Sequence, residues 1–434
     1  MVSLRQIGYR YRAATVGRSA RTSQQRAMPY ITRIDVFNHY KLPDFAVDFA
    51  STNGKPFRHL ILTGPNGSGK TTILTQLARD ITLSKGGTGT RHERTTAANM
   101  IPVHEQELSR TPAEYRGYRS QFLAQSRAEL AAFAVETTWE PDPGGPFELL
   151  TAFLPAKRAL EVEKPKAIEK VDVKALPYGQ LLASQLLKYL VNLEVQSRLA
   201  KEEDPSASAA ISHWLDSLEL GLAELFEIPG LKLKFLRKEY DIRFVEPGGA
   251  EYDFNQLAAG HGSVLNILAE ILLRIPEGQL TVEDGAFATT PGVVVIDEIE
   301  THLHPSLQER ILPFLTHAFP RVQFIVATHS PAVICSIDNA LVWDLKSMEG
   351  VLSDELRGTP YGELMKIHFG IESDIDLRST KQLHQLKSLQ LNPRRSPAEQ
   401  AEYEQLANQL QKSSHPLALE VWTQLEQSKL AGKQ

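Results

Sequence analysis

The stretch GPNGSGKTT at residues 64–72 constrains the fold of this chain more than any other part of its sequence. It follows the apolar run RHLILTG (58–64) and opens the helically spaced run KTTILTQLARDI (70–81). The spacing fits G-x-x-x-x-G-K-[S/T], in which glycines allow backbone N–H groups to close around phosphates. Lys70 would then reach the β and γ phosphates, and the Thr71 hydroxyl would bind Mg²⁺. A strand, a glycine-rich turn and a helix in this order predict a phosphate-binding unit.

A second apolar run, VVVIDEIETHLHP at residues 293–305, ends in acidic side chains and two histidines. Two carboxylates and an H-x-H pair are compatible with a metal site built from this run alone. The run is also compatible with the acidic end of a nucleotide-hydrolysing strand. A Mg²⁺–triphosphate site needs a carboxylate at the end of a second buried strand, where Asp297 stands, and Glu298 would polarise the attacking water. The combination with residues 64–72 favours this second interpretation.

Two more segments fit the same site. IVATHS places His329 after another apolar strand, where a polar side chain would contact the γ phosphate. A structurally satisfied histidine is the alternative, but three polar side chains at three strand ends disfavour it. FNQLAAGHGSVLNILAEILLRI (254–275) is a small-residue turn, with Gly260 and Gly262, that opens a helix. The free N–H groups at that helix start would favour an anion.

Apolar strands that alternate with helices predict a mostly parallel α/β sheet of the P-loop NTPase class, with a helical insertion and a helical C-terminal tail. The 434 residues are enough to bury a large core. The expected segments are a basic tail (1–29), the first part of the ATPase head with the phosphate loop (30–85), an insertion (86–245), the second part of the head (246–376) and C-terminal helices (377–434).

Local patterns refine this organisation. Residues 84–99 are polar and rich in glycine, which predicts a loop or a disordered segment. LKLKFL and YDIRFVE (231–246) predict strands that return to a sheet. Further helices are predicted over 112–134, 177–200, 208–226, 379–391, 396–411 and 416–429. The amphipathic pair at 177–226 would form an arm or a lid.

Composition bounds the environment of the chain. Cys335 is the only cysteine, so no internal disulfide forms, and a reducing cytoplasm is expected. No apolar run approaches the ~20 residues of a membrane span. Residues 1–29 hold six arginines and neither an acid nor a lysine, which is typical of a nucleic-acid arm or a transit peptide. An unstructured start, or translation from Met28, is the favoured alternative.

The order of the motifs resembles the ABC-type ATPase head in its soluble, SMC/RecF-like branch. DEIETHLHPSLQ resembles the D-E-x-x-x-x-L-H-P run of bacterial stand-alone AAA-type ATPases, among them predicted ATP-binding proteins involved in virulence and the ATPases of Septu, retron and OLD-like anti-phage systems. FNQLAAGHGSVLNILAEI resembles their signature, and TPYGELMKIHFGIESDID (359–376) resembles a later segment. The resemblance covers roughly residues 30–390.

The resemblance implies a role for each matching position. ATP would be held by Gly64, Pro65, Asn66, Gly67, Ser68, Gly69, Lys70, Thr71 and Thr72. Thr71 and Asp297 would hold Mg²⁺, Glu298 would be the catalytic base and His329 the switch histidine. A homodimer would close on two ATP molecules, with the γ phosphate reached in trans by Leu257, Ala258, Ala259, Gly260, His261, Gly262 and Ser263. His302 and His304 fall in the loop that crosses this interface, and interface or packing roles are favoured over metal ligation.

The sequence departs from the family at several positions. Ala258 stands where the signature serine is usual, which predicts weaker activation in trans, and His261 replaces a Gln, Glu or Tyr. No Q-loop glutamine is identified. FLPAKR (153–158) stands where members of the family have a strand that ends in an arginine, which makes Arg158 a candidate site residue. Phe37 or Tyr40 is a candidate for stacking on adenine, but core packing is favoured for both.

Three functions follow from these motifs. The first is a cytoplasmic ATPase that controls a separate effector, such as a nuclease or a toxin, in bacterial defence; the chain itself shows no nuclease motif. The second is a DNA-repair or chromosome-maintenance ATPase, for which weak, salt-sensitive nucleic-acid binding stays open although the insertion is too short for a long coiled coil. The third is a scaffold that binds ATP without hydrolysing it, which Ala258 favours and Glu298 disfavours. A transporter subunit is disfavoured.

Overall fold

A computed structural model describes residues 29–51, 54–85, 89–112, 115–142, 149–158, 162, 164–165, 182–275, 280–283, 286–369, 377–392 and 394–412. The described residues fall into two compact units, divided between Gly358 and Thr359. The predicted basic tail, apart from Pro29, and the predicted helix 416–429 lie outside the described residues.

The first unit is built on a six-stranded sheet in the order β14-β13-β3-β12-β11-β5. Its strands are β3 (His59–Thr63), β5 (Leu150–Leu154), β11 (Gly292–Ile296), β12 (Val322–Ala327), β13 (Ala340–Asp344) and β14 (Glu349–Leu352). All neighbours are parallel except β13 and β14. Every residue of β3, β11 and β12 is buried, as expected for a parallel sheet covered on both faces. The predicted α/β P-loop class is confirmed.

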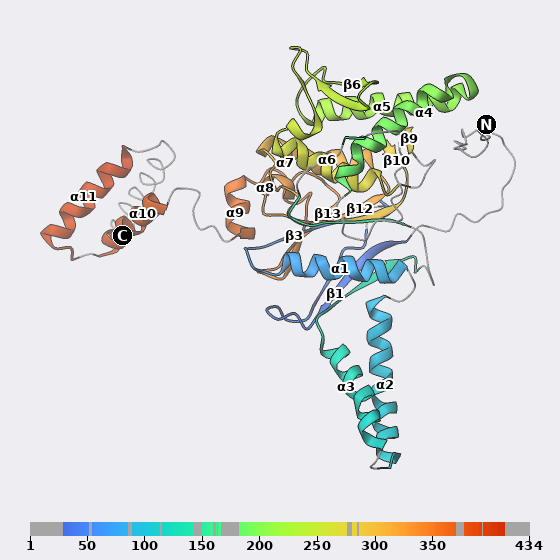
Figure 1. The fold of residues 1–434 in the computed structure, drawn as a ribbon. Coiled ribbons are helices and arrows are strands. Elements are labelled where there is room, and N and C mark those ends of the chain that lie inside the picture. Colours follow the sequence, from blue (N-terminus) through green and yellow to red (C-terminus); the bar gives the residue numbers. More distant parts are fainter. Residues whose placement is uncertain are drawn as a thin grey trace. The chain divides into compact units, whose positions relative to one another are not determined.

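A second, antiparallel sheet has the order β2-β1-β4. It consists of β1 (Tyr30–Phe37), β2 (Phe45–Asp48) and β4 (Ala134–Glu140). Helix α1 (Lys70–Lys85) lies between this sheet and the six-stranded sheet (Figure 1). Apolar side chains of β1, α1, β3 and β11 form one core cluster, to which α1 contributes Ile73, Leu74, Leu77 and Ile81. The helix that follows the phosphate loop is therefore fixed on two sides.

Two helices, α2 (Thr90–Arg110) and α3 (Arg116–Ala131), form a hairpin that projects from the second sheet (Figure 1). The loop predicted at residues 84–99 is therefore wrong from Thr90 onward. The segment has almost no apolar face, so its periodicity gave no helical signal. The helix begins because the Asp80 carboxylate accepts the Thr90 N–H at 2.7 Å, and it is supported by its partner helix, as in the Arg127–Glu105 ion pair.

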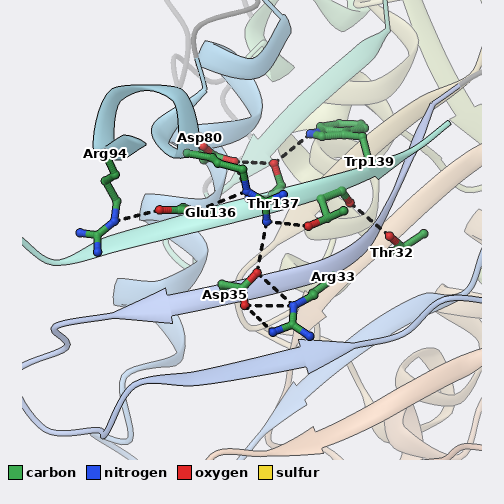
Figure 2. A network of polar contacts seen from close by, with 10 residues as sticks. Thr32, Arg33, Asp35, Asp80, Arg94, Glu136, Thr137 and Trp139 are labelled. Atoms are coloured by element: carbon green, nitrogen blue, oxygen red, sulfur yellow. Dashed lines mark hydrogen bonds and ion pairs between the residues drawn. The ribbon is translucent and has the colours of Figure 1, made fainter. Parts of the chain in front are cut away.

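Figure 2 shows a polar network around β4, in which Asp80 of α1 bonds Thr137. The Asp80 carboxylate, 1% exposed, accepts the N–H and the hydroxyl of Thr137, and the Trp139 indole donates to that hydroxyl. On the opposite side of β4, Glu136 pairs with Arg94 of α2. The network joins α1, α2 and β4, so the root of the hairpin is connected to the helix of the phosphate loop.

The insertion continues as η4 (Ala183–Gln185), α4 (Leu186–Glu203) and α5 (Pro205–Leu225). The predicted helix pair is present, with Asp204 as the N-cap of α5 and the Ser197 hydroxyl bonded to the Ser208 carbonyl. It is followed by β6 (Lys232–Leu236), β7 (Asp241–Val245) and β8 (Glu251–Tyr252), which form a sheet of their own. The predicted strands exist and lie in this separate sheet, where β6 and β7 pair as a hairpin whose outer strand stays partly exposed.

The rest of the first unit positions the candidate site. Its elements are η5 (Phe254–Gln256), α6 (Ala259–Leu272), β9 (Leu280–Glu283), β10 (Ala286–Ala288), α7 (Pro305–Ala318) and α8 (Pro331–Ile334). Residues 262–272 of α6 are all buried. Among the described residues, no helix combines the length and apolar character needed to cross a bilayer.

The second unit contains α9 (Tyr361–Phe369), α10 (Leu377–Leu391) and α11 (Pro397–Gln411). Helices α10 and α11 pack through a small core of Leu383, Leu386 and Leu410. A capping box opens α11: the Ser396 hydroxyl accepts the Glu399 N–H, and the Glu399 carboxylate accepts the Ser396 N–H.

Candidate nucleotide-binding site

The phosphate loop connects β3 to α1 and requires glycine at three positions. Gly64, Gly67 and Gly69 have φ values of +133°, +75° and +100°, which side chains of L residues rarely adopt. A Cβ atom on Gly69 would also lie 2.8 Å from Nε2 of His39. The loop backbone is therefore free to curve inward, as a phosphate cradle requires.

Lys70 opens α1 and is 5% exposed. Its ammonium donates to the carbonyl oxygens of Gly64 (2.8 Å) and Pro65 (3.1 Å) within the loop. Burial lowers the pKa of Lys70, and the carboxylates of Asp297, Glu298, Glu300 and Asp344 oppose that shift. Residues from three strand ends thus surround one buried cation beside the loop.

Asp297 follows β11 and is 1% exposed. Burial raises its pKa, whereas the Thr71 hydroxyl and the charges of Arg158 and Lys70 lower it. The Thr71 hydroxyl is close enough to lower the pKa of Asp297. Neither Asp297 oxygen, however, has a hydrogen-bond partner of normal geometry among the described residues. An unpartnered buried carboxylate beside a hydroxyl is the oxygen-donor set that Mg²⁺ prefers. Asp297 and Thr71 fit the predicted metal site.

Glu298 has a φ of +46°, uncommon for a residue with a side chain. It is half-buried, and the Thr301 hydroxyl donates to its carboxylate at 3.4 Å. Arg158, beyond the end of β5, donates to the carbonyl oxygens of Asp297 and Glu298 at 2.8 Å each. Arg158 is 4% exposed, and burial lowers its pKa to about 10. The structure thus places Arg158 behind the turn at Asp297 and Glu298, where it holds the backbone that carries Glu298.

The sequence interpretation gave no role to Glu300, which connects this turn to the end of β12. Its carboxylate accepts the backbone N–H of His329 and the hydroxyl of Thr328, the latter at 2.8 Å. Burial lowers the pKa of the half-buried His329, as does Lys70, whereas Glu298 raises it. The histidine ring is therefore electrostatically coupled to both the lysine and the candidate base.

The signature turn packs against the predicted interface loop of the same chain. A Cβ atom on Gly260 would lie 3.0 Å from the His302 carbonyl, and the Ser263 hydroxyl donates to the Thr301 carbonyl at 3.1 Å. Ala258, the N-cap of α6, has no side-chain bond to offer. His261 stacks on Phe226 with ring centroids 4.0 Å apart, and burial lowers its pKa. Leu257, Ala259 and Gly262 complete this turn, with Gly262 buried.

The histidine pair lies in the loop between Glu298 and the start of α7. His302 and His304 are exposed, and His302 has a φ of +67°. Nδ1 of His304 accepts the Ser306 N–H at the start of α7. Among the described residues, no group of three or more His, Cys, Asp or Glu side chains could hold a metal ion. The interface role of both histidines stays a prediction.

A loop between β1 and β2 covers the phosphate loop, and the sequence patterns did not indicate it. His39 is 6% exposed, and its Nδ1 accepts the N–H groups of Lys41 and Leu42. The Lys41 ammonium donates to the Gly67 carbonyl at 3.3 Å. The core packing expected for Tyr40 is wrong, because this side chain is 70% exposed. Phe37 is half-buried and lies under the Arg94 guanidinium.

Comparison with known proteins supports this picture. Residues 178–335 match the family described as an AAA domain, putative AbiEii toxin, Type IV TA system. The retron Ec83 probable ATPase of Escherichia coli is 32% identical over 200 residues, 45% of this chain and 35% of that protein. The Septu protein PtuA of Bacillus thuringiensis is 26% identical over 130 residues, 28% of this chain and 31% of that protein. The matched regions span about a third of these relatives.

Solved structures with a similar arrangement include the SMC head domain from Thermotoga maritima. It is 12% identical, and the alignment covers 72% of this chain and 94% of that one with a TM-score of 0.33. The assignment of the fold therefore rests on the strand order and the phosphate loop of this chain. The resemblance drawn from the sequence motifs is confirmed by the family and relatives above. The fold is of the P-loop α/β class, residues 178–335 are similar to the AAA-domain family, and parts of the chain are similar to the retron Ec83 probable ATPase and the Septu protein PtuA.

Proposed function

We propose that this protein binds Mg²⁺–ATP and hydrolyses it to ADP and phosphate. The observation that carries the proposal is Asp297, a buried carboxylate without a hydrogen-bond partner among the described residues, beside Lys70 and Thr71 of the phosphate loop. A buried unpaired carboxylate is unfavourable by itself, so its retention at this place favours a ligand that compensates it. A bound divalent cation would supply that compensation.

Each residue then has a chemical task. The loop from Gly64 to Thr72 would surround the phosphates, and Lys70 would exchange the loop carbonyls for phosphate oxygens. Bound Mg²⁺, held by Thr71 and Asp297, would neutralise developing charge on the phosphates. Glu298 would accept a proton from, or orient, the attacking water. His329, kept neutral near pH 7 by the lowered pKa, would hydrogen-bond the γ phosphate.

A measurement of phosphate release distinguishes ATP hydrolysis from ATP binding alone. Wild type should release phosphate from ATP only with Mg²⁺, and Asp297→Asn should bind ATP yet lose Mg²⁺-dependent turnover. Glu355→Ala, an exposed acid in a distant turn, is the matched control and should behave as wild type. Absence of turnover in wild type, with ATP bound, would exclude hydrolysis by the isolated protein.

We also propose that two copies close on ATP. The signature turn and the loop at His302 and His304 pack together in one chain and both have exposed residues, so a partner subunit would meet them as one surface. Sedimentation of the wild type with and without a non-hydrolysable ATP analogue tests this step. A monomer in both conditions would contradict it.

The biological role that fits is control of a separate effector, such as a nuclease or toxin, in a bacterial anti-phage system. Support for this role comes from the similarity to the retron Ec83 probable ATPase and the Septu protein PtuA, of which the matched regions span about a third. Co-purification of the protein with the products of its neighbouring genes tests the effector. An adjacent recombination gene, together with turnover stimulated by DNA alone, would favour the repair alternative.

A scaffold that binds ATP without hydrolysis is the second candidate, and one observation favours it. Ala258 offers no side-chain donor, and the Ser263 hydroxyl is occupied by the Thr301 carbonyl. Trans activation would then depend on backbone N–H groups. Replacing Ala258 by serine should raise turnover if the missing hydroxyl limits hydrolysis, whereas a true scaffold should stay inactive.

A further inference from the structure

The loop after Glu298 is attached by hydrogen bonds to two other parts of the site. On one side, Ser263 of α6 donates to the Thr301 carbonyl. On the other, Glu300 accepts the backbone N–H of His329 and the hydroxyl of Thr328. Among the described contacts of this loop, only the Glu300 side chain bonds directly to the segment that carries His329.

Each oxygen of the Glu300 carboxylate accepts a hydrogen bond in these contacts. Burial raises its pKa, and the bonds from His329, its own backbone and Thr328 lower it. The Thr328 hydroxyl that donates to Glu300 also accepts the Ser330 N–H at 3.0 Å. Ser330 in turn donates to the Gln308 side chain of α7 at 2.6 Å, and Gln308 donates to the Leu303 carbonyl at 2.9 Å. The chain of contacts leaves the loop at Glu300 and returns to it at Leu303.

We propose that Glu300 is a positioning residue that sets the His329 ring against the γ phosphate and couples this placement to the interface loop. This inference rests on the proposed ATPase function. The Glu300 side chain holds the backbone N–H of His329 and therefore determines the position from which the His329 side chain extends. A shift of the loop, of the kind that contact with a second subunit would produce, would move His329 through Glu300. Glu300 itself touches neither nucleotide nor water in this account.

The inference predicts a separation between binding and turnover. Glu300→Ala should keep ATP affinity within about twofold, because no loop–phosphate contact is lost, while kcat falls at least about tenfold, as misplaced catalytic groups do. Glu300→Gln can still accept the His329 N–H and bond the Thr328 oxygen, so it should retain kcat within about threefold. Glu355→Ala again serves as the control acid.

A double-mutant cycle distinguishes positioning from general support of the fold. If Glu300 acts through His329, Glu300→Ala should cause no further loss of kcat in a His329→Ala background. Additive losses, or equal losses of affinity and kcat, would overturn the inference. If Glu300→Ala does not fold, Thr328→Val removes the bond from the Thr328 hydroxyl to Glu300, together with the acceptor of the Ser330 N–H, with little change in volume. Its smaller loss of kcat should likewise vanish in the His329→Ala background. An inactive wild type would refute the proposed function instead, whereas an active Glu300→Ala would refute only this inference.

Discussion

Replacing Arg158 by methionine should free the catalytic turn while leaving the fold largely intact. The guanidinium donates to the carbonyl oxygens of Asp297 and Glu298 at 2.8 Å each. Two hydrogen bonds from a charged donor contribute about 3–6 kcal/mol together. Burial opposes them, because it lowers the pKa of Arg158 from 12.5 to about 10, which corresponds to about 3 kcal/mol. The net loss of folding stability is about 0–3 kcal/mol, so Tm should fall by only a few degrees.

Turnover should respond much more strongly than stability. Glu298 is held at a φ of +46°, and such conformations persist only where the surroundings enforce them. Without Arg158 the turn relaxes, and displacement of a catalytic group by about 1 Å lowers the rate about 100-fold. Lysine at position 158 keeps the charge but not the forked geometry, so it should give an intermediate kcat.

The assay combines steady-state phosphate release, titration with a fluorescent ATP analogue and a thermal melt. Arg158→Met should show a kcat about 100-fold below wild type, with ATP affinity and Tm nearly unchanged. Wild-type kcat in Arg158→Met would refute the role of Arg158 in placing Glu298. Parallel loss of affinity, Tm and kcat would show that Arg158 supports the whole domain rather than the turn.

Three further predictions concern parts of the chain outside the catalytic turn. Lys41→Ala should raise the Kd for ATP about three- to tenfold, as expected for the loss of one exposed charge–phosphate contact of about 1 kcal/mol. The control Lys238→Ala, in an exposed turn, should leave the Kd unchanged. Equal effects of the two variants in a binding titration would exclude a local contact between Lys41 and ATP. Burial lowers the pKa of His59 to about 3, so below pH 6.5 the unfolded chain binds a proton that the folded chain does not, and stability is lost as pH falls, by about 2 kcal/mol at pH 5. His59→Asn keeps an acceptor for the Phe324 N–H, which His59 accepts in the wild type. In urea unfolding this variant should lack this part of the pH dependence of stability. An unchanged pH dependence would contradict the burial argument. Asp80→Ala should destabilise the domain by about 2–5 kcal/mol because the N–H groups of Thr90 and Thr137 lose their buried acceptor; a denaturant midpoint equal to that of wild type would show that the network in Figure 2 is replaceable.

The sequence was most informative where local pattern and chemistry agree. The apolar strand before Gly64, the strand before Asp297 and the strand before His329 were all identified, and the structure places them in one sheet with their carboxyl ends together. Parallel strands end at the same edge, so motifs that each follow a buried strand meet there. This is why a site assembled from distant segments could be predicted without a structure.

The missed features depend on contacts between distant residues. Helix α2 has little apolar periodicity, and its start is fixed by Asp80 of another helix. Strands β6 and β7 have ordinary strand patterns, which do not specify the sheet that a strand joins. The loop at His39 and Lys41 carries no phosphate-binding pattern, and it covers residues 64–72 only because β1 and β2 pair. Glu300 looks like one more acid after Glu298 until its partners directly after β12, Thr328 and His329, are known.

The central claim, that Glu298 drives hydrolysis of ATP held by two closed subunits, is tested most directly with Glu298→Gln. The amide keeps the size of the side chain but cannot accept a proton from water. After incubation with Mg²⁺–ATP and gel filtration, this variant should elute as a dimer that retains one unhydrolysed ATP per subunit, while wild type releases ADP and returns to the monomer. A Glu298→Gln protein that still turns over ATP at the wild-type rate, or that holds ATP as a monomer, would contradict the account.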